Sequence, residues 1–210
     1  MTKPNALLEV QGVSRSFGGL KAVQNVSLEV PQGSLTALIG PNGAGKTTLF
    51  ALLSGFLTPD SGRVVFKGQD ITGQAPHLNA KLGMTRTFQI VQPFAAQTVR
   101  ENIAVGAHLH TASREQALAT AELVAQRVGL ADQLDKLASD LTVAGRKRLE
   151  LARALATAPE LLLLDEVLAG LNPQEIAEMI PVVRAIAASG VTVLMIEHVM
   201  QAVMSLAEHV

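Results

Sequence analysis

The sequence contains no cysteine, tryptophan or tyrosine, and its acidic and basic residues nearly balance, with a formal net charge of −1. The absence of cysteine excludes disulfides and thiolate metal sites, which fits a reducing compartment. Without a broad basic field, nucleic acid is not expected as a partner. No stretch offers the roughly 18 uncharged apolar residues of a spanning helix, and the N-terminus has no signal-peptide core, so we expect a chain that does not cross a membrane.

What the sequence does contain is enough apolar residue, 48% of 210 positions, to bury the core of one large domain. Residues 7–13 (LLEVQGV) and 22–30 (AVQNVSLEV) alternate apolar and polar positions, which predicts antiparallel strands with one solvated face. Three continuously apolar runs, SLTALIG, ELLLLD and VTVLMIE, are typical of strands buried on both faces of a parallel sheet. Each precedes a helix-like segment, so we expect an α/β core.

A helical lobe is predicted inside this core. The segments REQALATAELVAQRVGL (114–130) and RKRLELARALA (146–156) are apolar at helical spacing, with no convincing strand between them. We therefore expect one domain over residues 1–210, with the α/β core at about 1–90 and 158–210 and the inserted lobe at about 91–157.

Residues 40–47 read GPNGAGKT, the phosphate-loop pattern, and stand between an apolar strand and a helical segment. Glycines let successive backbone N–H groups turn toward an anion, and the helix N-terminus adds partial positive charge. Lys46 is predicted to reach the β- and γ-phosphates and Thr47 to ligate Mg²⁺. A glycine-rich turn without a ligand is the alternative that this context disfavours. The candidate nucleotide-binding residues here are Gly40, Pro41, Asn42, Gly43, Ala44, Gly45, Lys46, Thr47 and Thr48.

A pair of carboxylates, Asp165 and Glu166, ends the apolar run LLLLDE. Open α/β sheets gather ligand-binding residues at the carboxyl ends of their strands. Asp165 is predicted to help hold Mg²⁺, and Glu166 to polarise an attacking water. The alternative is an acidic pair that only supports a helix N-terminus.

With these motifs in this order, the chain resembles the nucleotide-binding subunit of ATP-binding cassette (ABC) transporters over nearly its whole length. The resemblance implies an α/β fold of the P-loop NTPase (RecA-like) type that uses ATP and Mg²⁺. It assigns Phe17, in VSRSFGGLKAV, to stacking on adenine; Gln89, in RTFQ, to the metal shell and catalysis; and His198, in MIEHV, to the γ-phosphate. Taken singly, each is more often a core ring, a surface amide or a satisfied polar group; their order favours the family roles.

Residues 83–108, GMTRTFQIVQPFAAQTVRENIAVGAH, are similar to the subgroup that imports branched-chain and other hydrophobic amino acids. That similarity implies transmembrane permease subunits, a second nucleotide-binding subunit and, indirectly, a periplasmic substrate-binding protein as partners. It implies a peripheral position on the cytoplasmic face of the inner membrane. Phe94, in IVQPFAAQTV, suits a shallow apolar groove that receives a permease helix, with an ordinary packed loop as the equal alternative.

The sequence departs from the family pattern at three places. The usual signature LSGGQ reads LTVAG, with Thr142, Val143, Ala144 and Gly145 at its last four positions. Asn172 stands where aspartate is usual. The chain ends at SLAEHV, whereas the resemblance implies further C-terminal strands. We still expect residues 142–145 to contact ATP on the partner subunit, because backbone N–H groups at a helix start bind anions whatever the side chains.

The predicted function is ATP hydrolysis that energises uptake of branched-chain or other hydrophobic amino acids. Glu166, His198 and Gln89 are the catalytic candidates, and Thr47, Gln89 and Asp165 the Mg²⁺ ligands. Two alternatives remain open: a nucleotide-binding regulatory module with little turnover, suggested by the altered signature, and the ATPase of a lipid or lipopolysaccharide exporter. Uptake of urea or amides would leave the same sequence pattern.

Overall fold

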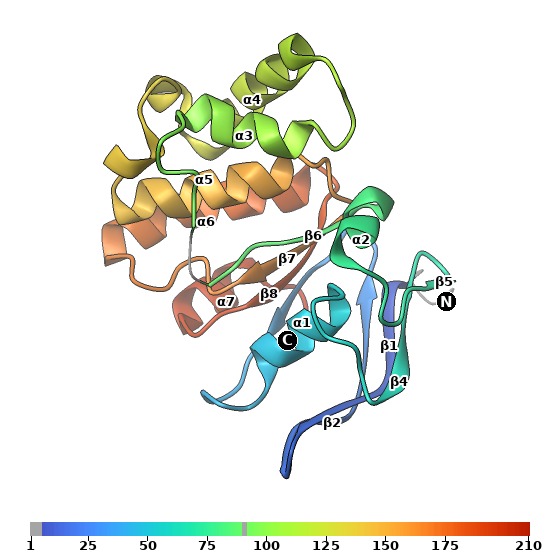
Figure 1. Cartoon of the computed structure of the whole chain (residues 1–210). Helices are drawn as coiled ribbons and strands as arrows, with labels where there is room; N and C mark the ends of the chain where they lie inside the picture. Colours follow the sequence, from blue (N-terminus) through green and yellow to red (C-terminus); the bar gives the residue numbers. More distant parts are fainter. Residues whose placement is uncertain (1–5, 90–91) are drawn as a thin grey trace.

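Two four-stranded sheets, one antiparallel and one parallel, organise residues 6–89 and 92–210, which are the residues that the computed structural model describes (Figure 1). The strands are β1 (Ala6–Phe17), β2 (Leu20–Pro31), β3 (Leu35–Leu38), β4 (Ser61–Phe66), β5 (Gln69–Asp70), β6 (Met84–Arg86), β7 (Leu161–Asp165) and β8 (Thr192–Ile196). The helices are α1 (Lys46–Leu53), α2 (Pro76–Leu82), α3 (Val99–Ala107), α4 (Arg114–Val128), α5 (Val143–Leu155), α6 (Pro173–Ala188) and α7 (Met200–Leu206), with single 3₁₀ turns at Ala131–Gln133 and Ala138–Asp140.

The antiparallel sheet has the strand order β2-β1-β4-β5. Along β1, Leu8, Val10 and Val13 are buried whereas Glu9 and Gln11 are not, as expected for a sheet with one face on the core. The predicted pair of antiparallel strands is thereby confirmed. The sequence analysis did not predict β4 and β5, which extend this sheet from the other edge of β1.

The parallel sheet has the order β3-β8-β7-β6, and its two central strands, β7 and β8, are buried at every position. Because successive side chains point to opposite faces of a strand, Leu161 and Leu163 join one hydrophobic cluster while Leu162 and Leu164 join another. The three predicted strands are confirmed as β3, β7 and β8. Burial on both faces holds for β7 and β8, whereas the edge strand β3 is only partly buried at Thr36 and Leu38. The short strand β6 completes the sheet and leads directly to Gln89.

Helix α1 lies between the two sheets. Its buried side chains, among them Phe50, pack with β1 and β4 on one side and with Leu161 and Leu163 of β7 on the other. In this way the antiparallel layer, α1 and the parallel sheet form consecutive layers (Figure 1). The element that follows the phosphate loop is therefore clamped on both sides.

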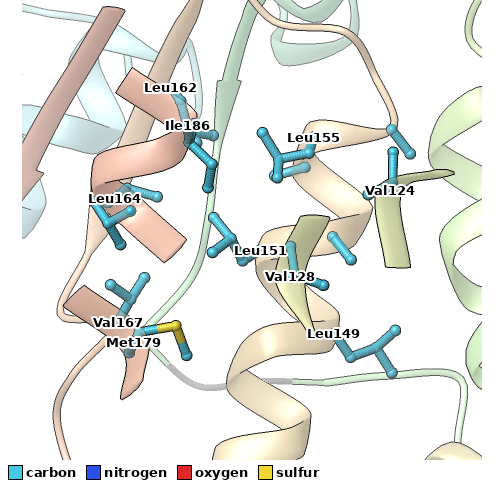
Figure 2. Packing of buried hydrophobic residues seen from close by; sticks show 14 of the residues in the cluster. Val124, Val128, Leu149, Leu151, Leu155, Leu162, Leu164, Val167, Met179 and Ile186 are labelled. Carbon is cyan, nitrogen blue, oxygen red and sulfur yellow. The ribbon is translucent and has the colours of Figure 1, made fainter. Parts of the chain in front are cut away.

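The opposite face of the parallel sheet is covered by helices. Leu162 and Leu164 pack in one cluster with α5 and α6 side chains such as Leu151, Leu155 and Ile186 (Figure 2). Helix α3 packs against both α4 and α5 on the far side of this layer (Figure 1). The helices expected from residues 114–130 and 146–156 correspond to α4 and α5.

The last residues of the chain contact the outer edge of β3. Glu208 N–H donates to Leu35 O at 2.8 Å, and Ala37 N–H donates to His209 O at 2.9 Å, so that Thr36 and His209 form a parallel bridge. These bonds satisfy backbone groups that an open sheet edge would leave unpaired.

Gly106 on α3 provides a test of the helical packing. A Cβ at this position would clash with the carbonyl oxygen of Arg153 on α5. We expect Gly106→Ala to lower the free energy of unfolding by roughly 1–3 kcal/mol, since overpacking outweighs the gain in helix propensity. Urea denaturation of the chain measures the change. Gly19→Ala is the control, because a Cβ at Gly19 meets nothing within 4 Å; equal stabilities for the two variants would contradict the close packing.

Candidate functional site

The phosphate loop joins β3 to α1 and depends on glycines for its path. Gly43 and Gly45 have φ values of +81° and +87°, in the left-handed region that side chains rarely adopt. Gly45 also lies so close to the backbone of Ala22 that a Cβ would overlap its carbonyl oxygen. Both positions therefore favour glycine because of their backbone conformation, and Gly45 also requires it because a side chain would not fit.

The Lys46 side chain curls over this loop. It begins α1, has an exposed fraction of only 9%, and its Nζ donates to Gly40 O at 2.8 Å and to Pro41 O at 2.9 Å. These carbonyls keep the ammonium satisfied at the centre of the loop, where an anionic oxygen would accept from it more strongly. The neighbouring Thr47 is exposed and lines the adjoining groove.

A groove of about 520 Å³ brings most of the predicted site residues together. Phe17 lines this groove, is 45% exposed, and has the Arg15 guanidinium 5.2 Å from its ring centroid. Leu20, Lys21 and Ala22 line the same groove and were not predicted from the sequence. The predicted residues that line it are Phe17, Asn42, Gly43, Ala44, Gly45, Lys46, Thr47, Thr48, Gln89, Glu166 and His198.

The Glu166 carboxyl contacts the two other predicted catalytic residues. Gln89 Nε2 donates to Glu166 Oε2 at 2.7 Å, and His198 Nε2 lies 2.7 Å from Glu166 Oε1. The three residues follow β6, β7 and β8, so the carboxyl ends of three parallel strands converge here. Glu166 has a φ of +51°, a left-handed conformation uncommon for a residue with a side chain.

Asp165 is fully buried and paired with Arg86 on β6. Arg86 Nη2 donates to Asp165 Oδ2 at 2.8 Å, whereas the buried Oδ1 atom has no hydrogen-bond partner. Burial raises the pKa of Asp165, and the Arg86 hydrogen bond and charge oppose that shift. The free Oδ1 atom and the exposed Thr47 hydroxyl are oxygen donors of the kind Mg²⁺ prefers. The described residues contain no group of three His, Cys, Asp or Glu able to hold a metal by themselves.

The altered signature begins α5 and does not line the groove in the described part of this chain. Thr142 is the N-cap, and its hydroxyl oxygen accepts from Gly145 N–H at 3.1 Å. Ala144 lies within the helix, without a positive φ, so its Cβ causes no backbone strain. Val143 is 56% exposed. The helix start therefore persists without the usual pair of glycines.

Asn172, at the position where aspartate is usual, caps α6. Its side-chain oxygen accepts from the N–H groups of Gln174 and Glu175, both at 3.0 Å, and the Asn172 N–H donates to Glu175 Oε2 at 2.9 Å. Because this capping box needs only a short side chain with an acceptor oxygen, asparagine performs it as well as aspartate.

A second cavity, of about 660 Å³, lies between β6, α3 and α5. It is larger than the groove, but Lys46 and Glu166 do not line it, so among the described residues the groove is the better candidate for phosphate chemistry. Phe94, predicted to line a docking groove, is 45% exposed and stacks with the Arg153 guanidinium at 4.9 Å. Ile90 and Val91 of that predicted segment lie outside the described residues.

Comparison with known proteins identifies the family. The sequence pattern of the ABC transporter family matches residues 23–169. The chain belongs to the ABC transporter family. It is 39% identical to the high-affinity branched-chain amino acid transport ATP-binding protein LivG of Escherichia coli (strain K12), over 100% of this chain and 88% of LivG. BraF of Pseudomonas aeruginosa, with the same description, is 38% identical over the same shares.

Solved structures agree with the fold of ABC cassettes. A nucleotide-free ATP-binding cassette from an ABC transporter superposes with a TM-score of 0.88 and 32% identity, over 97% of this chain and 85% of that chain. The ADP conformation of MJ1267, an ATP-binding cassette of an ABC transporter, superposes with a TM-score of 0.85 and 33% identity, over 96% of this chain and 85% of that chain. The α/β P-loop NTPase architecture is thereby confirmed. No helix in the described part of this ABC protein has the length and apolar character to cross a membrane.

Several residues behind the groove were missed by the sequence analysis. Arg86 pairs with Asp165, Glu197 Oε1 accepts from Leu168 N–H at 2.9 Å, and the Lys147 ammonium contacts two backbone carbonyls. For Arg86 and Glu197 the sequence offered one signal, which is that they stand at or directly after the end of a strand. Lys147 carried no such signal, because one basic residue among three on a helix looks solvated.

Glu150 on α5 is a further buried ionisable group that the sequence analysis did not predict. It accepts a hydrogen bond from Phe88 N–H, and burial raises the pKa of its carboxyl, while that bond and the charges of Lys147 and Arg153 oppose the shift. The folded protein therefore binds this proton more tightly than the unfolded chain does. The associated stabilisation is complete at low pH and is lost as the pH rises through the folded-state pKa.

We expect Glu150→Gln to gain stability relative to the parent as the pH rises from about 4.5, the ordinary pKa of the carboxyl, through its raised value. The amide has no proton to lose and still accepts from Phe88 N–H. Above the raised pKa the difference should become constant. Urea unfolding of both proteins across this pH series measures it, and a difference that does not vary with pH would contradict the role of burial.

Proposed function

We propose that this ABC protein is the ATP-binding and ATP-hydrolysing subunit of an importer for branched-chain or other hydrophobic amino acids. The observation that carries the proposal is the groove in which the phosphate loop faces the hydrogen-bonded trio of Gln89, Glu166 and His198. The named transport function of LivG and BraF, which align with the whole chain, supports the choice of cargo class.

In this proposal the phosphate loop binds ATP. Lys46 and the loop N–H groups would hold the β- and γ-phosphates, and the exposed face of Phe17 would stack on adenine. Mg²⁺, when bound, would neutralise charge on the phosphates. Thr47, Gln89 and Asp165 would hold it, with the unpartnered Asp165 Oδ1 as the supporting observation.

Glu166 would act as general base for the attacking water. Its side chain is only 13% exposed, and both carboxyl oxygens already have partners that fix their orientation. His198 would orient Glu166 through its 2.7 Å contact and would reach the γ-phosphate from the segment that follows β8. Arg86 pairs with the neighbouring Asp165 and opposes the rise in the Asp165 pKa that burial causes.

The proposal includes a second nucleotide-binding subunit, because Thr142, Val143, Ala144 and Gly145 begin α5 away from the chain's own groove. In a head-to-tail dimer this helix start would contact ATP bound to the partner. Permease subunits would dock on the lobe at about residues 91–157, on the cytoplasmic face of the inner membrane. A periplasmic substrate-binding protein would act through them.

The proposal is tested in proteoliposomes that contain the chain, its permeases and its binding protein. We expect Glu166→Gln to retain ATP binding and to lower ATPase turnover roughly 100- to 10,000-fold, since an amide cannot accept the proton of water.

Lys46→Ala should weaken ATP binding roughly 10- to 100-fold, because a phosphate oxygen loses a charged donor. Parental ATP affinity of Lys46→Ala by calorimetry would refute the phosphate loop, and parental turnover of Glu166→Gln would refute the base.

The altered signature separates this proposal from a regulatory module with little turnover. Because Ala144 is helical, we expect Ala144→Gly to change the ATPase rate only modestly, whereas Ala144→Asp should nearly abolish it by opposing a phosphate with a carboxylate. Ala131→Asp, at an exposed position of the same lobe, is the control. Parental activity of Ala144→Asp would show that this helix start does not meet nucleotide and would favour the regulatory module.

A further inference from the structure

Lys147 is a buried cation on the helix that carries the altered signature. It lies on α5, five residues after the N-cap Thr142, and its exposed fraction is 7%. Its Nζ donates to Glu166 O at 3.1 Å and to Gln89 O at 3.3 Å. A buried ammonium requires such acceptors, because loss of its hydration is otherwise costly.

The two acceptor residues also meet through their side chains. Gln89 Nε2 donates to Glu166 Oε2 at 2.7 Å, so Lys147, Gln89 and Glu166 form a closed ring of hydrogen bonds. The ammonium joins the two backbones, and the amide and the carboxyl join the two side chains. The ring therefore sets the distance between the end of β7 and the segment that follows β6.

The Glu166 backbone needs such support. Its φ of +51° is a conformation that persists in residues with side chains only when the surroundings hold it. Three hydrogen bonds at this residue do so: Glu166 N–H donates to Ile196 O at 3.0 Å, and Glu166 O accepts from Ala169 N–H at 3.1 Å as well as from the Lys147 ammonium. The direction of the Glu166 side chain depends on this conformation.

Lys147 also provides positive charge among buried acids. Burial raises the pKa of the carboxyls of Glu150, Asp165 and Glu197, and Lys147 is among the charges that oppose each shift. The ammonium thus offsets part of the negative charge gathered behind the groove.

We propose that Lys147 is a positioning residue that clamps the peptides of Gln89 and Glu166, and thereby couples the signature end of α5 to the catalytic carboxylate of the same subunit. This inference rests on the proposed function. Because α5 is rigid and Lys147 lies little more than one turn beyond Thr142, a displacement of the helix start by the partner's nucleotide moves both carbonyls. Each ATP site then senses the other through one side chain.

The first test needs no nucleotide. Lys147→Met removes the donor and keeps an unbranched side chain of nearly the same length. Lys147→Arg keeps donors and charge, and Lys136→Met makes the first change at an exposed lysine of the same lobe. In the purified chain, we expect the Glu166 amide to exchange its hydrogen about tenfold faster in Lys147→Met, as for the loss of one hydrogen bond. Lys136→Met should leave that rate unchanged. A parental rate in Lys147→Met overturns the clamp.

The second test uses the reconstituted transporter. We expect Lys147→Met to lower the kcat for ATP about tenfold or more while the KM changes less than twofold, because Lys147 does not line the groove among the described residues. Lys147→Arg should restore most of the kcat. A loss that falls on KM, or a parental kcat in Lys147→Met, overturns the positioning role. Absence of ATPase in the parent transporter refutes the proposed function instead, and the exchange result still decides the clamp.

Discussion

Burial of strand β7 on both faces is the constraint on which the rest of this structure depends. Leu161 and Leu163 pack toward α1, whereas Leu162 and Leu164 pack toward α5 and α6 (Figure 2). One five-residue strand thus joins both hydrophobic clusters. Every position of β7 is buried, and its parallel pairing with β6 on one side and β8 on the other fixes its register. The strand end, with Asp165 and Glu166, is therefore delivered to a fixed point beside the phosphate loop.

Around that point the protein buries charges and gives each a defined partner. Arg86 pairs with Asp165, Lys147 donates to two carbonyls, and Glu197 accepts from a backbone N–H. A buried charge without a partner would destabilise the folded protein, because it loses its hydration without a compensating interaction. These partners orient the residues at the groove. Asp165 keeps one carboxyl oxygen without a hydrogen-bond partner, and Glu166 contacts Gln89 and His198.

The altered signature separates what the side chains of this motif contribute to the helix start from what the backbone contributes. Thr142 caps α5 through its hydroxyl oxygen, and Ala144 adopts helical geometry, so the helix start forms without adjacent glycines. The anion-binding capacity of a helix N-terminus resides in its N–H groups and dipole. Asn172 repeats this relationship at α6, where a capping oxygen suffices in place of a carboxylate.

The sequence by itself determined the α/β class, the strands β3, β7 and β8, the phosphate loop and the carboxylate pair, because these follow from local periodicity and from residue types at short spacing. It could not predict β5, a two-residue strand whose existence depends on pairing with β4, nor the partners of Asp165 and Glu166. Arg86 stands 79 residues from Asp165, and Lys147 stands 58 from Gln89. Only the packing of β6, β7 and α5 around one core decided that these side chains meet, since burial and hydrogen-bond satisfaction are properties of the assembled layers and not of any single segment.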